Sequence, residues 1–196
     1  MFRALRKRGG VKLLAATLAV GAMCAWSRAA TPDDSGNREY RLKANFLVTA
    51  PDFVEWPAGR SNDGQNTFFV CVTGRYSFGM QLAEMTRSKE VKGKRVEVKW
   101  VRKDVELRNC QVVFVSGSEE KRYGSILQAL EGSSALTVGE TRGFLDAGGM
   151  VALETTERGL KFEINLEATN EAGLRLSSRL LALARRVVQG SKLAKR

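Results

Sequence analysis

The sequence contains no histidine, and this absence excludes several kinds of functional site. A serine or cysteine hydrolase that relies on a histidine base cannot be built from it, and neither can a zinc site that needs imidazole ligands. The acidic residues Asp33, Asp34, Glu119, Glu120 and Glu154 lack the aspartate-and-glycine spacing of a calcium-binding loop. The sequence therefore predicts neither a metal site nor a cofactor, and an enzyme is the least favoured class of function.

Long apolar runs are also absent, except for one near the start of the chain. A basic leader precedes the apolar stretch Leu13–Trp26, and Ser27-Arg28-Ala29 places small residues where signal peptidase cleaves. The stretch is short for a membrane span, which disfavours an uncleaved anchor. Lipidation at Cys24 is disfavoured because the preceding Met23 is large. We predict a cleaved signal peptide over residues 1–29 and export of the mature chain to the periplasm.

The positive charge of the chain lies largely outside the predicted mature domain. Residues 1–29 hold six Lys/Arg and no Asp/Glu, so their removal lowers the formal net charge from +11 to +5. A short basic tail, residues 191–196, carries part of the remainder. Nucleic-acid binding needs a basic surface on the folded domain, so we predict no nucleic-acid partner.

Cysteine is scarce, with three in the chain and two in the predicted mature part, Cys71 and Cys110. In an oxidising compartment an even pair favours a disulfide. The alternative is a pair of buried thiols that pack as small hydrophobic groups. Export makes the disulfide the preferred interpretation.

Short apolar runs alternate with helical patterns through the middle of the chain. This alternation is typical of a mainly parallel β-sheet flanked by helices. A C-terminal antiparallel hairpin follows, and a closing helix is predicted from its cap Ser177 to Val188. The other predicted strands are 68–72, 96–101, 112–115, 136–138, 150–153 and 160–166, the other predicted helices are 39–53, 77–85 and 118–130, and 143–149 is predicted as a loop.

These elements predict one α/β domain over residues 39–190. A flexible mature N-terminus, residues 30–38, is expected before it and the basic tail after it. The mature chain of about 167 residues is long enough for a single hydrophobic core.

The loop Gly74–Gly79 resembles a phosphate-binding loop in the spacing of its glycines. Met80 and Gln81 stand where that motif requires lysine and a hydroxyl residue. Without them the phosphates and magnesium lose their partners, so nucleotide binding is not predicted.

Glu163 and Asn165 lie one strand period apart and could face a cleft together. The preferred interpretation is structural, with Asn165 capping the helix near Leu166 and Glu163 exposed or ion-paired. The aromatic segment Phe53–Pro57 has two interpretations as well. Its Phe53 and Trp56 either pack into the core or present Trp56 to a partner, since large aromatic side chains supply much of the affinity at interfaces.

Five stretches, taken in order, resemble the YfiR family of periplasmic regulators from about Leu42 to Val188. They are Phe53-Val54-Glu55-Trp56-Pro57, Phe69-Val70-Cys71-Val72, Cys110-Gln111-Val112-Val113-Phe114-Val115, Gly143-Phe144 with Gly148-Gly149-Met150-Val151, and Phe162-Glu163-Ile164-Asn165 leading to Gly173-Leu174 and Ser177-Ser178. The sequence departs from the family at Ala50-Pro51-Asp52, where many members carry a Phe-Ala-Lys-like stretch, and it lacks a second cysteine pair found in some members.

The resemblance implies regulation without catalysis. The best-understood members bind the periplasmic sensor domain of an inner-membrane diguanylate cyclase and hold it inactive, and an outer-membrane, peptidoglycan-binding lipoprotein can release them. It also implies a homodimer and a Cys71–Cys110 disulfide. We assign partner binding to Phe53, Glu55, Trp56 and Phe144, and a structural role to Gly148, Gly149, Glu163, Asn165 and Ser177.

Two other functions stay open at this point. The chain could serve another receptor, such as a histidine kinase, or it could be a small-ligand-binding sensor of the envelope. A deep apolar pocket near Trp56 and Phe144 would favour the sensor.

Overall fold

The computed structural model of the chain describes residues 32–58, 66–75 and 79–189. The predicted signal peptide, the basic tail and the expected helix cap Ser77 lie outside these residues. No helix in the described ranges is long and apolar enough to cross a membrane.

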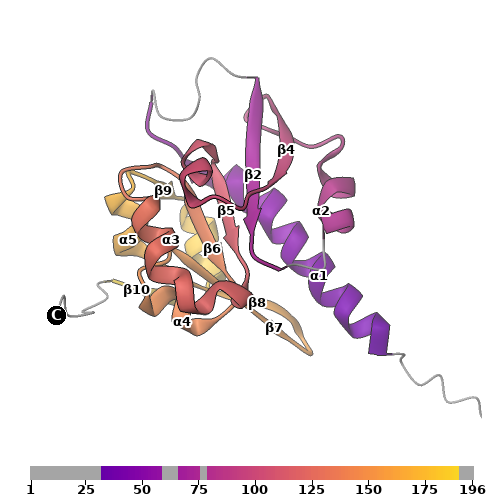
Figure 1. The fold of residues 1–196 in the computed structure, drawn as a ribbon. Helices are drawn as coiled ribbons and strands as arrows, with labels where there is room; N and C mark the ends of the chain where they lie inside the picture. Colours follow the sequence, from indigo (N-terminus) through magenta and orange to yellow (C-terminus); the bar gives the residue numbers. More distant parts are fainter. Residues whose placement is uncertain (1–31, 59–65, 76–78, 190–196) are drawn as a thin grey trace, which may run out of the picture. The chain divides into compact units, whose positions relative to one another are not determined.

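A mostly parallel, eight-stranded β-sheet forms the centre of the domain (Figure 1). Its strand order is β10-β8-β7-β6-β5-β2-β4-β3. The pairs β7–β8 and β3–β4 are antiparallel, and the other neighbours are parallel. The strands are β2 (Thr67–Thr73), β3 (Glu90–Val91), β4 (Lys94–Trp100), β5 (Val112–Val115), β6 (Leu136–Gly139), β7 (Val151–Thr156), β8 (Gly159–Asn165) and β10 (Arg186–Val188). The predicted α/β class, with its C-terminal antiparallel hairpin, is confirmed.

Helices cover both faces of this sheet (Figure 1). The helices are α1 (Pro32–Thr49), α2 (Gly79–Thr86), α3 (Tyr123–Ala129), α4 (Arg142–Asp146), α5 (Leu166–Glu171) and α6 (Ser178–Leu183). Three 3₁₀ helices connect them to strands, namely η1 (Ala50–Phe53), η2 (Asp104–Asn109) and η3 (Gly117–Arg122). A separate two-stranded antiparallel sheet joins β1 (Val54–Glu55) to β9 (Arg175–Leu176).

Alternation along the strands divides the interior into two cores. In β2 the side chains of Val70 and Val72 pack in the core that includes Leu47 of α1, whereas Cys71 packs in the core that includes Tyr123 of α3. Successive side chains of a strand point to opposite faces. Each face of the sheet therefore has its own apolar layer, and a residue's place in the alternation decides which helices it contacts.

The first helix differs from the prediction at both ends. It begins at Pro32, within the segment expected to be flexible, and it ends at Thr49 rather than Phe53. Proline has no backbone N–H and fixes its own φ. Pro51 lies at the start of η1, which replaces the last turn of the predicted helix.

The predicted closing helix is wrong beyond Leu183. Helix α6 ends at Leu183, and β10 pairs in parallel with β8, with Val187 opposite Ile164. Parallel pairing with β10 covers the edge of β8, and the β-branched Val187 and Val188 favour a strand there.

Two further boundaries differ from the prediction. Residues 143–146, expected within a loop, belong to α4. The helix predicted over 118–130 is η3 followed by α3, and the side chain that caps its start belongs to Ser116 rather than Ser118.

Candidate functional site

The disulfide predicted from the two mature cysteines is present. The Cα atoms of Cys71, in β2, and Cys110, just before β5, are 5.9 Å apart, well within the range a disulfide can bridge. Two hydrogen bonds hold the strands at this point, from Gln111 N to Phe69 O at 3.0 Å and from Phe69 N to Gln111 Oε1 at 2.7 Å. Both cysteines are buried, so the bond lies inside the domain, between neighbouring parallel strands.

The aromatic segment forms part of the small β1–β9 sheet. Val54 is buried opposite Leu176, while Glu55 is exposed opposite Arg175. Ser177 N donates to Phe53 O at 2.9 Å and so ties this segment to the start of α6. Glu55 is thus the side chain of this segment that is most available to another molecule.

Trp56 is half-buried and packs against the core. Its ring packs edge-on against Phe68, with ring centroids 5.4 Å apart. The ammonium of Lys92 lies 5.5 Å from the Trp56 ring centroid and donates to Val54 O at 2.6 Å. The indole nitrogen is buried and has no hydrogen-bond partner within the described ranges. One part of Trp56 therefore supports the core while another part stays at the surface.

Phe144 does not belong to this surface, which corrects the prediction of a partner-binding role for it. Its side chain is 0% exposed and packs edge-on against Tyr123, with centroids 5.0 Å apart. It lies in the core with Cys71, whereas Trp56 packs against the opposite core. Phe144 is buried because α4 directs its side chain toward the sheet.

The glycines around Phe144 explain that burial. A Cβ on Gly149 or on Gly139 would lie 2.3 Å from the Phe144 ring, closer than any real contact. Gly148 has a φ of +100°, which only glycine adopts without strain. These glycines let the ring lie directly against the backbone.

Glu163 is 6% exposed and ion-paired, and with Lys43 and Glu140 it lines a cavity of about 460 Å³. Its Oε1 accepts from Arg185 Nε at 3.0 Å, and its Oε2 accepts from Arg186 Nε at 3.0 Å. Burial raises the pKa of Glu163, but the hydrogen bonds and charges of the two arginines outweigh it, and the pKa lies below its ordinary value. Glu163 thereby fastens β10 to the sheet.

Both expected helix caps lie at their helices. The Asn165 side chain accepts from Ala168 N at 3.1 Å, and the Ser177 side chain accepts from Leu180 N at 3.3 Å. Each satisfies a backbone donor of the first turn.

A second buried ion-pair network lies at the carboxyl ends of β5 and β6 and was missed from the sequence. Lys43 of α1, 5% exposed, bonds to Glu39 at 2.5 Å and to Glu140 at 2.6 Å. Glu140 also accepts from Gly117 N at 2.6 Å and from Ser116 Oγ at 3.1 Å. Burial lowers the pKa of Lys43, but its bonds to Glu140 and Glu39 outweigh it and raise the pKa above its ordinary value.

One part of this network is visible in the sequence, namely the pair Glu39 and Lys43. Glu39 and Lys43 are four residues apart on a helix, which is the spacing of a stabilising ion pair. Glu140 is 97 residues from Lys43, and no local pattern links them. Ligands of open α/β sheets bind outside the carboxyl ends of the strands. Here the network lies at that position and lines the cavity of about 460 Å³.

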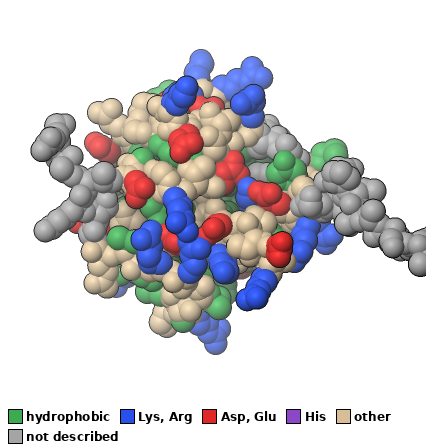
Figure 2. Space-filling model, turned by 90° about the horizontal axis from the view of Figure 1, so that it is seen from below, with side chains coloured by type: hydrophobic (Ala, Val, Ile, Leu, Met, Phe, Trp, Pro, Cys, Tyr) green, Lys and Arg blue, Asp and Glu red, His purple; other side chains and the backbone are tan. Residues whose placement is uncertain are grey.

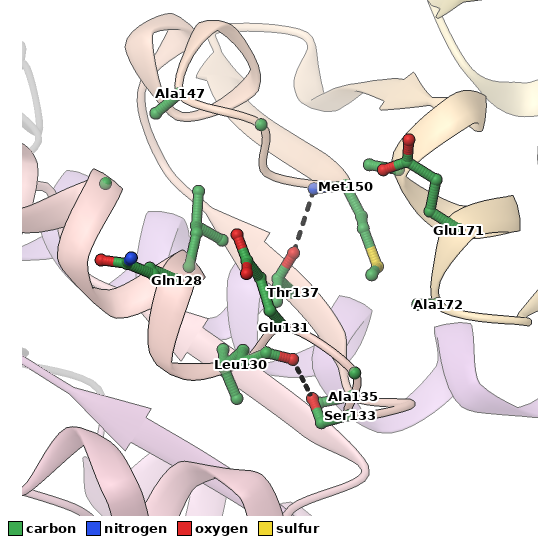
Figure 3. Close-up of a pocket in the computed structure, with 15 residues that line it drawn as sticks. Gln128, Leu130, Glu131, Ser133, Ala135, Thr137, Ala147, Met150, Glu171 and Ala172 are labelled. Atoms are coloured by element: carbon green, nitrogen blue, oxygen red, sulfur yellow. Dashed lines mark hydrogen bonds between the residues drawn. The ribbon is translucent and has the colours of Figure 1, made fainter. Parts of the chain in front are cut away.

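A cavity of about 390 Å³ lies at the other edge of the sheet, where β6 and β7 begin (Figure 3). Met150 N donates to Thr137 Oγ1 at 3.0 Å across its floor. Glu131 and Glu171 lie on its walls (Figure 3). Neither Trp56 nor Phe144 lines this cavity, so it is not the apolar pocket expected for a small-ligand sensor.

The surface charges are mixed. On the face seen in Figure 2, Lys and Arg side chains are interspersed with Asp and Glu. Such mixing is typical of a soluble surface rather than of a continuous basic patch.

Solved structures are similar to this chain at low sequence identity. The ABC domain in complex with L-Trp from Streptococcus pneumonia has 11% identity and a TM-score of 0.50, over 76% of this chain and 60% of that chain. A conserved domain protein from Vibrio cholerae O1 biovar eltor str. N16961 has 11% identity and a TM-score of 0.46, over 66% of this chain and 57% of that chain. The chain thus spans less than two thirds of the length of either. No curated protein matches it.

The family comparison covers most of the described domain. The YfiR/HmsC-like family matches residues 40–185, from α1 to the residue before β10. This range includes the aromatic segment, both cysteines of the disulfide and Glu163. The chain belongs to the YfiR/HmsC-like family.

Proposed function

We propose that this protein is a periplasmic regulator that binds and represses the sensor domain of an inner-membrane signalling enzyme, a diguanylate cyclase. The family match over residues 40–185 is the observation that carries the proposal. The Cys71–Cys110 disulfide supports it, because structural disulfides persist in oxidising compartments such as the periplasm. A homodimer and release by an outer-membrane, peptidoglycan-binding lipoprotein belong to the same proposal.

The buried charges of the domain have a structural role. Lys43 and Glu163 are the buried charged side chains of the described domain, and both are satisfied by ion pairs. Both also line the cavity of about 460 Å³, and their ion pairs hold α1 and β10 against the sheet.

The proposed partner surface is centred on Glu55 and Trp56, with Phe53 beside them. Trp56 provides a partly exposed aromatic surface, and Glu55 provides an exposed charge next to it. Interfaces draw much of their affinity from such aromatic residues, and neighbouring charges give specificity.

Intracellular cyclic di-GMP tests the proposal directly. A clean deletion should raise cyclic di-GMP above the wild-type level. Reintroduction of the wild-type gene should bring cyclic di-GMP back to that level. Glu55→Lys should fail to restore repression, whereas Glu97→Lys, an equal charge change at an exposed position of β4, should restore it. An unchanged cyclic di-GMP level in the deletion would remove the cyclase from the proposal, and periplasmic crosslinking would then identify another receptor such as a histidine kinase.

A further inference from the structure

The groove between α1 and α2 is not used by the proposed partner surface. It has a volume of about 530 Å³. It is lined by Asn37, Arg38, Arg41, Leu42 and Asn45 of α1 and by Met85 of α2.

The floor of the groove is apolar and its ends are polar. Leu42 and Met85 are each partly exposed along it, although both helices pack on the same core of the sheet. At one end Gln81 Nε2 donates to Asn37 Oδ1 at 3.4 Å and joins the two helices. From Asn37 to Asn45 the groove follows α1 for about 12 Å, or roughly two helical turns.

Two arginines on its rim have no acidic partner among the side chains that the structure describes. Arg38 and Arg41 are exposed and lie three residues apart on one face of α1. The neighbouring Lys43 lies on the other side of the helix and is fully engaged by Glu39 and Glu140. The rim therefore carries a local positive charge that the described side chains do not neutralise.

We propose that this groove binds an acidic amphipathic helix of a partner protein. A helix in a groove between two helices buries one apolar face, here against Leu42 and Met85. Carboxylates three or four residues apart on the partner would pair with Arg38 and Arg41, since that spacing puts them on one helical face. The inference rests on the proposed function, in which the protein acts by binding other proteins, and it adds a second surface with a stated partner chemistry.

A peptide experiment tests the groove without any cellular partner. The probe is a synthetic helix-forming peptide with two glutamates four residues apart beside one leucine face, and its control carries lysines in their place. Fluorescence anisotropy measures binding to the purified mature chain. Wild type should bind the acidic peptide and not the basic one, and the double variant Arg38→Glu/Arg41→Glu should bind it at least about tenfold more weakly.

The matched control is Arg158→Glu/Arg179→Glu. It makes the same change in net charge at exposed positions that do not line the groove, and it should bind the acidic peptide as wild type does. Equal weakening in both double variants would mean non-specific charge attraction and would overturn the inference. Failure of wild type to bind the acidic peptide would overturn it as well.

Measurements of cyclic di-GMP distinguish failure of the groove proposal from failure of the proposed function. If the deletion raises cyclic di-GMP and Arg38→Glu/Arg41→Glu restores repression fully, the groove proposal fails while the proposed function stands. If the deletion has no effect, the cyclase proposal fails, and the peptide measurement still decides the groove. Loss of repression in the groove variant, with repression kept by Arg158→Glu/Arg179→Glu, supports both.

Discussion

Reduction of the Cys71–Cys110 disulfide is expected to lower the free energy of unfolding by about 4 kcal/mol. The two cysteines are 39 residues apart in sequence, and the loop they close contains α2, β3, β4 and η2. On the chain-entropy model, opening a loop of this length returns about 13 cal/mol/K of conformational entropy to the unfolded chain, or about 4 kcal/mol at 25 °C. Domains of this size have a total stability of roughly 5–15 kcal/mol, so the loss is a large fraction of the whole.

The folded state should change little on reduction. The difference in the free energy of unfolding between oxidised and reduced protein therefore reports on the unfolded chain. Strands β2 and β5 keep their ladder, and the two hydrogen bonds between Phe69 and Gln111 do not depend on the sulfurs. Urea unfolding of oxidised and reduced protein, followed by circular dichroism, measures the difference. With a typical urea m-value of about 2 kcal/mol/M, the midpoint should fall by roughly 2 M on reduction.

A variant lacking both sulfurs provides the control for this measurement. Cys71→Ala/Cys110→Ala should unfold at the same urea concentration with and without reductant. If oxidised and reduced wild type share one midpoint, the disulfide does not constrain the unfolded chain and the reasoning is refuted.

In cells, Cys71→Ser should weaken repression and raise cyclic di-GMP. Equal repression by this variant and wild type would restrict the disulfide to a structural role.

Two other predictions concern stability. Glu163→Gln should lower the free energy of unfolding at pH 7 by about 1–2 kcal/mol, a modest loss because both arginine partners are partly exposed. The pKa of Glu163 is lower in the folded protein than in the unfolded chain. The extra stability of wild type over Glu163→Gln is therefore fully present at pH values above the unfolded pKa, and it is lost as pH falls through the folded pKa. Urea titrations between pH 7 and pH 3 check this, and a pH-independent difference would contradict it. Gly149→Ala should destabilise the domain by more than about 2 kcal/mol because its Cβ would overlap Phe144, whereas Gly124→Ala, in helix α3 with open space around it, should be neutral or stabilising by up to about 1 kcal/mol. Similar melting temperatures for these two variants would contradict the packing argument.

Local patterns sufficed for much of the sheet. The continuous apolar runs of β2 and β5 predicted buried strands because a strand covered on both faces has no polar side to show. The hairpin of β7 and β8 followed from two short strands around a turn. The caps at Asn165 and Ser177 followed from side chains that bond to backbone only a few residues away.

The C-terminal end shows where such patterns fail. The apolar residues of 180–188 recur at helical spacing, and that spacing is also compatible with a short helix followed by a strand. Only the open edge of β8 made the strand favourable for Val187 and Val188. Likewise, glycine spacing predicted a loop at 143–149, although the helix α4 places Phe144 against Gly139 and Gly149.

The sequence by itself determined the α/β class, the alternation of each strand and the caps, because these depend on neighbouring residues. Tertiary structure alone decided which distant groups meet. It brought Lys43 to Glu140, buried Phe144 away from Trp56, and left Arg38 and Arg41 on the rim of a groove. The physical reason is that periodicity reports which face of an element is apolar, whereas partners across the domain are selected by how helices pack on the finished sheet.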